Sequence, residues 1–316
     1  MSFTAPDNAH RFFFSGLPMQ LRNNGNLLAV FAFTLWGILP LYFNQLSSAD
    51  IFELLAVRII FSVPIMLLAM HFIAGTHPPI KTLLADKKSL FLCFLAGLTG
   101  LISLWAFTKA SSRGDVLAAS LGYFINPLCS IALAVVVLGE RLSWAKKTAV
   151  VLAVLGISYQ VFSYGELPWL SLIMAGAFAV YGLIKKFIKF DSFMSITIEV
   201  ILLMPLALLY MGWLYFNGES DFFSTTAAQQ WLYIGMAPAV LAPMILFSFA
   251  VDRASLSSIG LTQYIEPSLQ FLIAVLIFGE IFDQVKLVSF GFIWLGLIFC
   301  ILEAAKIIKS KEKVLN

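Results

Sequence analysis

Charged residues are scarce in this chain. Only 12% of its 316 residues are charged and 60% are hydrophobic, at a mean hydropathy of +0.93, whereas soluble globular proteins keep roughly a quarter of their residues charged. The dipeptide Gly-Lys never occurs, which excludes a Walker A loop for nucleotide phosphates. The three cysteines and three histidines are too scattered to indicate a metal cluster. The composition therefore predicts a membrane protein without a cofactor.

Long hydrophobic runs are abundant instead. A helix needs about 20 mainly apolar residues to span a bilayer, and such runs recur along almost the whole chain. We predict an all-α membrane protein with ten transmembrane helices. The expected spans are 26–45, 53–73, 89–109, 116–138, 144–162, 168–187, 192–216, 228–250, 256–278 and 286–306.

Basic residues are distributed unevenly between the predicted loops. With ten spans, sixteen of the 20 Lys and Arg residues fall on the side that holds both termini, and three fall on the other side. Because cytoplasmic loops collect Lys and Arg, we predict cytoplasmic tails at 1–25 and 307–316. The net charge of +3 then reflects topology and gives no sign of nucleic-acid binding. The basic C-terminal tail is expected to lie near anionic membrane lipid.

One motif occurs twice, at an offset of 140 residues. It reads YFINPLCSIALAVVVLGE at 123–140 and QYIEPSLQFLIAVLIFGE at 263–280, and 12 of the 47 ungapped positions around it are identical between the two copies. We therefore predict a duplication, with five-helix repeats at 26–162 and 163–306. Because five is an odd number of crossings, the second repeat is inverted. Inverted repeats are characteristic of secondary transporters.

Each copy of the motif places a proline and a polar side chain inside an apolar run. Proline removes a helical hydrogen bond, and a broken helix is tolerated in lipid where it lines water or protein. We predict helix breaks at these prolines and a central cavity beside them; the alternative is that the prolines only kink the helices for packing. The breaks are expected at Pro127 and Pro267, and the bordering residues are expected to be Tyr123, Asn126, Gln263, Tyr264 and Glu266.

Acidic and basic residues interrupt some of the predicted spans. Glu266 lies several residues inside a span, where a carboxylate is costly and is by default a functional hypothesis. It is the candidate proton carrier or partner of a cationic substrate group, and a hydrogen bond to a neighbouring helix is the alternative. Arg58 and Glu199 each precede a span proline by six residues. We expect a gating or structural role for both, with Glu53 as the candidate partner of Arg58.

Aromatic and small polar residues complete the candidate cavity lining. Trp36 and Tyr181 each precede a glycine in the first span of a repeat. Aromatic walls suit an amphipathic small molecule, although Trp and Tyr are also ordinary packing and interface residues. Ser103 and Trp105, in the third span, belong to the same group of candidates.

Six segments together resemble one known family: LWGILPLYF (35–43), ELLAVRIIFS (53–62), SLGYFINP (120–127), LPWLSL with YGLIKK (167–186), IEVILLMPLALLY (198–210) and LTQYIEPSLQFLIAVLIFGEIF (261–282). They are similar to RarD-type permeases, which are EamA-domain members of the drug/metabolite transporter superfamily. The resemblance runs from about residue 25 to 306. It implies ten helices in two inverted repeats, the bacterial cytoplasmic membrane, and transport of a small molecule.

The chain departs from this family pattern in two spans. The family has a His before the arginine of span two, where this chain has Val57. It also has an Asn-Trp pair and a second Trp in span three, where this chain has Ser103, Leu104 and Lys109. If those family residues line the cavity, the substrate preference of this chain differs.

The leading interpretation is a secondary transporter that exports a small organic solute by alternating access. The solute would be a metabolite, an amino-acid-like compound or a drug. A gradient must drive the transport because no nucleotide motif exists, so proton or ion coupling is an expected partner function, and a homodimer remains open. Two alternatives are an integral-membrane enzyme acting on a lipid or small molecule, and a channel. Short loops without His/Asp/Glu clusters disfavour the enzyme.

Overall fold

Helices form all the regular secondary structure in the part of the chain that the computed structural model describes, which is 24–46, 49–71, 80–112, 116–165, 169–277, 279 and 284–315. The all-helical class agrees with the prediction. The helices are α3 (Gly25–Phe43), η1 (Asn44–Leu46), α4 (Ile51–Ala69), α5 (Ile80–Ala85), α6 (Lys87–Ser112), α7 (Val116–Val136), α8 (Trp144–Tyr164), α9 (Trp169–Lys185), α10 (Ser192–Asn217), α11 (Asp221–Ser224), α12 (Ala227–Arg253), α13 (Leu256–Thr262), α14 (Ile265–Leu276) and α15 (Gln284–Leu315).

Many of these helices are suited to a bilayer by length and composition. Among the described residues, seven are long and apolar enough to cross a membrane: Gly25–Leu46, Ile51–Ala69, Lys87–Ala106, Trp144–Tyr164, Ser192–Asn217, Ala227–Arg253 and Gln284–Glu303. Tyr123–Val136 and Trp169–Lys185 are shorter apolar helices. The span predicted at 256–278 is divided between α13 and α14, and α15 continues to Leu315, beyond its predicted end at 306.

Polar residues in the sequence fix where several helices begin and end. The Asp191 side chain accepts a hydrogen bond from the backbone N–H of Met194 and starts α10, and Ser143 does the same for Lys146 and starts α8. Such N-caps satisfy backbone donors that lack a helical partner. Gly218 ends α10 at a φ of 67°, in the left-handed conformation that glycine adopts without a steric penalty.

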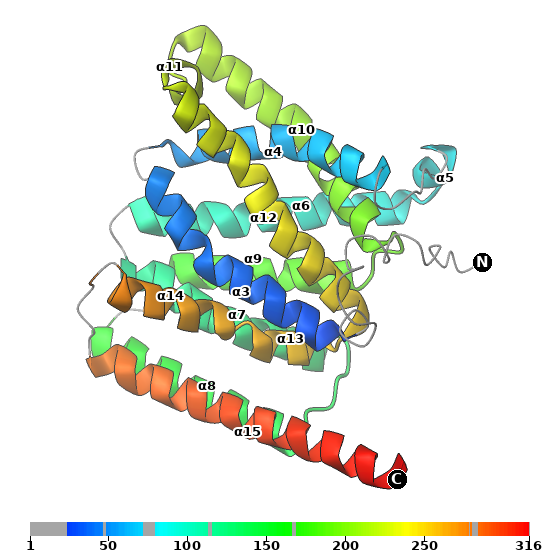
Figure 1. Ribbon diagram of the computed structural model, residues 1–316, viewed down its shortest axis with the longest axis vertical. Coiled ribbons are helices and arrows are strands. Elements are labelled where there is room, and N and C mark those ends of the chain that lie inside the picture. The colour runs from blue at the N-terminus through cyan, green and yellow to red at the C-terminus, as the bar shows by residue number, and fades with distance from the viewer. Residues whose placement is uncertain are drawn as a thin grey trace.

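The helices form a bundle with two distinct ends. α3 begins and α15 ends at the same end of the bundle, on the right of Figure 1, which we call the terminal end. η1 and α11 lie at the opposite end, which we call the far end. α8 and α15 pack together along one edge, and α4 and α10 pack together on the opposite side. The remaining helices lie between these two pairs.

The packing of the first half of the chain is repeated in the second half. α6 packs on α9 as α12 packs on α3, and α6 packs on α10 as α12 packs on α4. At the α8–α15 contact, a Cβ on Gly156 would lie 2.8 Å from the Ser289 carbonyl oxygen, and one on Gly296 would lie 2.9 Å from the Ala149 Cα. An offset of 140 residues converts one contact into the other. The glycines allow this close approach of the two backbones.

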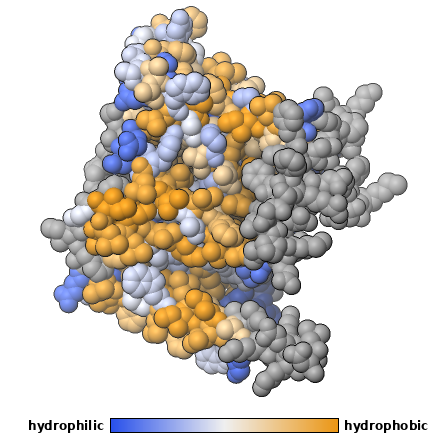
Figure 2. All heavy atoms as spheres, in the orientation of Figure 1, coloured by the Kyte–Doolittle hydropathy of each residue, from blue (hydrophilic) through white to orange (hydrophobic). Residues whose placement is uncertain are grey.

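The surface of the bundle is largely apolar. Figure 2 shows hydrophobic residues over most of the described part of one face. Large side chains such as Phe216, Phe162 and Trp144 are more than four-fifths exposed, at 87%, 85% and 82%. Such broad apolar exposure is unlike a soluble monomer, whose apolar patches are small. It fits helices that contact lipid.

Candidate functional site: a polar cavity between the two halves

A cavity of about 200 Å³ lies inside the bundle. Its walls come from α3, α4, α6, α7, α9, α10, α12 and α14, so both halves of the chain contribute. Polar and charged side chains reach it from helices that are otherwise apolar. Eight of the residues predicted from the sequence line it: Trp36, Arg58, Ser103, Tyr123, Asn126, Tyr181, Glu199 and Glu266.

Glu199 has an ionic partner that the sequence analysis missed. Lys185 Nζ lies 2.6 Å from Glu199 Oε1, and both side chains are buried. Tyr181 donates its hydroxyl to Glu199 Oε2 at 3.3 Å, and Lys185 also contacts Ser195 Oγ at 2.5 Å. Lys185 had been assigned to a loop by charge counting, whereas it lies in the last turn of α9. This network neutralises Glu199 at the wall of the cavity.

Arg58 does not pair with Glu53, so the predicted partner is wrong. Glu53 accepts hydrogen bonds from the Ser220 hydroxyl and from the backbone N–H groups of Asp221 and Phe222, at 2.8 and 3.1 Å for the latter two. It therefore attaches α4 to α11 at the far end, away from the cavity. Arg58 Nε is buried without a hydrogen-bond partner among the described residues. Its guanidinium lines the cavity with no carboxylate within 4 Å in the same set of residues.

Glu266 and Gln270 occupy one face of α14. They are four residues apart, which places them on the same side of a helix, and Gln270 Nε2 donates to Glu266 Oε1 at 3.3 Å. Both residues line the cavity. Gln270 was missed by the sequence analysis, although its spacing from Glu266 could have indicated it. Asn126 on α7 also faces this site, and its Oδ1 has no partner in the described structure.

Three predicted residues are not among those that line the cavity. Tyr264 is buried in an apolar cluster with Phe124 and Leu261, because it lies about 200° around the helix axis from Glu266. Gln263 accepts a hydrogen bond from Ser130 on α7 at 3.3 Å. Trp105 is 38% exposed on the bundle surface.

The two prolines have different local structures, so the prediction of two helix breaks is half wrong. Pro127 lies inside α7, which continues without interruption. Pro267 follows a turn at Gln263 and Tyr264 that separates α13 from α14. Proline has no N–H, so the Gln263 carbonyl accepts instead from the backbone N–H of Glu266 at 3.1 Å.

The residues at which this chain departs from the family pattern are in different environments. Val57 is buried in the apolar core beside α10 and α12. Ser103 donates its hydroxyl to the Met174 carbonyl at 2.9 Å and links α6 to α9. Leu104 lines the cavity. The side chain of Lys109 lies outside the described residues.

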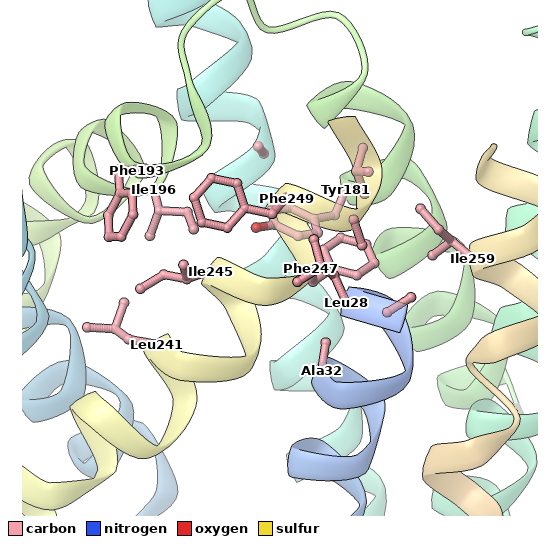
Figure 3. Packing of buried hydrophobic residues seen from close by; sticks show 14 of the residues in the cluster. Leu28, Ala32, Tyr181, Phe193, Ile196, Leu241, Ile245, Phe247, Phe249 and Ile259 are labelled. Atoms are coloured by element: carbon pink, nitrogen blue, oxygen red, sulfur yellow. The ribbon is translucent and has the colours of Figure 1, made fainter. Parts of the chain in front are cut away.

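An aromatic cluster closes the cavity toward the terminal end. Figure 3 shows Phe247 and Tyr181 packed among Leu28, Ala32 and other buried apolar residues of this cluster. The Phe247 and Tyr181 rings stack with centroids 5.8 Å apart, and Trp36 meets Phe178 edge-on at 5.7 Å. Tyr181, Trp36 and Phe178 also line the cavity. The cluster thus forms its apolar floor.

Polar contacts reinforce this closure at the terminal end. Glu140, in the loop after α7, accepts hydrogen bonds from the backbone N–H groups of Leu256 and Ser257 at 2.7 and 3.0 Å. Partial burial raises the pKa of Glu140, but these hydrogen bonds outweigh burial, and its pKa lies below the ordinary value. Lys146 Nζ contacts the hydroxyls of Ser255, Ser257 and Ser258 at 3.3, 3.2 and 2.6 Å. These bonds join the first half of the chain to the start of α13.

Comparisons with known proteins agree with this architecture. The profile of the EamA-like transporter family matches residues 23–161. An "Uncharacterized transporter" of Vibrio cholerae serotype O1 is 34% identical over 290 residues, which are 91% of this chain and 95% of the relative. "Protein RarD" of Escherichia coli (strain K12) is 34% identical over 284 residues, 89% and 94% of the two chains. A solved crystal structure with 15% identity superimposes with a TM-score of 0.64 over 88% of this chain and 98% of that chain, which shows a shared fold.

The apolar helical bundle with a polar cavity inside it defines a multi-pass membrane protein of the transporter class. Identity of about a third over nearly the whole length extends this conclusion to the family level. The chain belongs to the EamA-like transporter family, and its bacterial relatives include proteins named RarD.

Proposed function

We propose that this protein is a secondary transporter that exports a small organic solute across the bacterial cytoplasmic membrane by alternating access. The observation that carries the proposal is the cavity between the two halves, where Arg58 and Glu266 reach into an otherwise apolar interior. Ionisable groups inside a membrane bundle are costly, and they mark substrate or ion pathways.

The repeated packing supports a mechanism with two states. We propose ten crossings in two inverted repeats, in which α13 and α14 together make one crossing. The reciprocal contacts Gly156–Ser289 and Gly296–Ala149 are those expected for helices related by a two-fold axis. Two similar halves of opposite orientation have two nearly equivalent packings, and exchange between them moves the opening from one side to the other.

The position of the cavity supports one of these states. Phe43 and Met236 line it in the far half of the bundle, whereas the aromatic cluster and the Glu140 and Lys146 bonds close the terminal half. We propose cytoplasmic termini from the excess of basic residues on that side. The structure then corresponds to a state closed toward the cytoplasm, and the other state would require the aromatic cluster to separate.

Glu266 is the proposed site of coupling to a proton gradient. It lies at mid-height in its crossing, about ten residues from the start of α13 and from the end of α14. Its printed partner is a neutral amide, Gln270, so the carboxyl can bind or release a proton without breaking an ion pair. Glu199 is less suited to this task because Lys185 already compensates its charge.

Counterflow in proteoliposomes tests the proposed function. Purified protein is reconstituted into vesicles loaded with a bacterial metabolite extract, and exchange against labelled extract is followed by mass spectrometry. The proposal predicts saturable exchange that is stimulated by solute on the opposite side and lost in Glu266→Gln. Glu219→Gln is the matched control, because Glu219 is exposed in the loop after α10. Flux that does not saturate and shows no stimulation from the opposite side would identify a channel and contradict the proposal.

A further inference from the structure

The charges in the cavity are not balanced in the same way. Glu199 is neutralised by Lys185 at 2.6 Å, and this is the ion pair found in the described part of the chain. Arg58 and Glu266 also line the cavity, yet neither has an oppositely charged side chain within 4 Å among the described residues. One positive and one negative group are therefore left facing the same space.

The Arg58 guanidinium carries the stronger indication of a ligand. Arginine remains protonated in proteins and has five N–H donors but no acceptor. Its Nε is buried without a partner, and an unpaired buried charge is strongly unfavourable. A carboxylate fits a guanidinium with two parallel hydrogen bonds. A bound carboxylate would supply the partner that the chain itself does not provide.

Glu266 offers the complementary group across the cavity. In its ionised form it accepts hydrogen bonds only, and Gln270 occupies one of its oxygens. The other oxygen remains available to an ammonium group. Asn126 Oδ1, which also lines the cavity and has no partner in the described residues, is a second acceptor for such a group.

The shape and walls limit what lies between the two charged groups. Trp36 and Phe178 present aromatic surface, and the volume of about 200 Å³ is smaller than the usual drug-sized pocket. From these features we propose that the transported solute is a small zwitterion of the amino-acid type, whose carboxylate binds Arg58 and whose ammonium binds Glu266. This proposal rests on the transport function proposed above and names its substrate class.

Three probes that differ by one charged group test this assignment. L-phenylalanine carries both groups, 3-phenylpropanoate lacks the ammonium, and phenethylamine lacks the carboxylate. Flux of each labelled probe is measured in proteoliposomes, together with the other proteinogenic amino acids. We expect at least one amino acid to be exchanged, and the zwitterion to exceed both analogues by at least about tenfold, the size of one charge-assisted hydrogen bond.

Two variants separate the two ends of the solute. Arg58→Gln should lower zwitterion flux at least about tenfold and leave the amine without a carboxylate unaffected. Glu266→Gln should lower it similarly and leave the acid without an ammonium unaffected. Arg141→Gln and Glu219→Gln are matched controls, because both residues are exposed in loops.

The outcomes distinguish this inference from the proposed function. If labelled metabolite extract exchanges but no proteinogenic amino acid exceeds the rate of protein-free vesicles, the zwitterion assignment is overturned and transport stands. If the zwitterion and its analogues are carried equally, or if both variants keep the wild-type ratios, the assignment is overturned as well. If neither extract nor amino acids exchange, the proposed function fails together with it.

Discussion

The two copies of the proline motif have nearly the same sequence pattern but different structures. In the first half, Pro127 lies within the uninterrupted helix α7, and in the second half Pro267 follows the turn between α13 and α14. The carbonyl that Pro267 leaves free accepts a hydrogen bond from Glu266. A proline therefore permits a break, while the neighbouring contacts determine whether one forms.

The two copies also carry different chemistry at equivalent positions. Asn126 corresponds to Glu266 at the offset of 140 residues, and both side chains line the cavity. The first half thus presents a neutral amide where the second half presents a carboxyl group. This difference teaches that the duplication supplied the architecture, and that divergence within it placed the charge on one side of the cavity.

The largest effect is expected from exchanging these two groups. Glu266→Gln removes the charge from α14, and we expect transport to fall at least about tenfold because a charge-assisted contact is lost. Asn126→Gln changes the equivalent position on α7 without removing a charge and should reduce transport much less. Initial rates in proteoliposomes at equal amounts of inserted protein measure both. Equal losses in the two variants would contradict the asymmetry.

The next effect concerns the helix break. Pro267→Ala restores an N–H that can bond the Gln263 carbonyl, and it allows α13 and α14 to join into one helix. We expect reduced transport with little change in thermal stability. Pro127→Ala should have a small effect on transport because α7 is already continuous. Rates together with melting temperatures in detergent test this pair, and an unaffected Pro267→Ala variant would show that the break is not needed.

A third prediction concerns the crossing of α7 and α13. A Cβ on Gly260 would lie 3.0 Å from the Pro127 carbonyl oxygen and 2.8 Å from Ile131 Cγ1. Gly260→Ala should therefore destabilise the protein by about 1–3 kcal/mol through overpacking. Gly212→Ala on α10 is the control, since a Cβ there meets nothing within 4 Å, and it should be neutral or stabilising by about 1 kcal/mol. Denaturant unfolding in detergent gives both values, and equal stabilities would refute the close contact.

The smallest effect is expected at Tyr264. Its hydroxyl is buried without a partner among the described residues, and the equivalent residue in the first half is Phe124. Tyr264→Phe removes a polar group that lacks a hydrogen bond and should stabilise the protein by about 1 kcal/mol. A control is Tyr181→Phe, which loses the hydrogen bond to Glu199 and should be destabilising. Destabilisation by Tyr264→Phe would reveal a partner for its hydroxyl.

The sequence alone predicts the helical membrane class and much of the cavity lining. Hydrophobic length locates the helices within a few residues, and a carboxylate within an apolar run, as at Glu266, indicates a functional site. Helix phase was the missing step. Trp105 lies about 200° around α6 from Ser103, and the same spacing separates Tyr264 from Glu266. Because lipid-facing and core-facing surfaces are both apolar, hydrophobicity does not reveal which face turns inward.

Partners between distant helices were harder to predict. Lys185 was counted as a loop cation, but it lies in α9 and pairs with Glu199 on α10. Glu53 was assigned to Arg58 because the two are close in sequence, whereas its partners are residues 220–222 at the far end. Such pairs depend on how helices pack, and sequence spacing carries information only within one helix.

Paired distance measurements at the two ends of the bundle test the alternating-access account most directly. Spin labels at Asn44 and Trp169 report on the far end, and labels at Asn26 and Lys189 report on the terminal end, in a chain whose three cysteines are replaced. Double electron–electron resonance is recorded in nanodiscs with and without the solute that supports counterflow. The account predicts that the far-end distance shortens as the terminal-end distance lengthens. Two distances that stay fixed, or that lengthen together, during measurable exchange would contradict it.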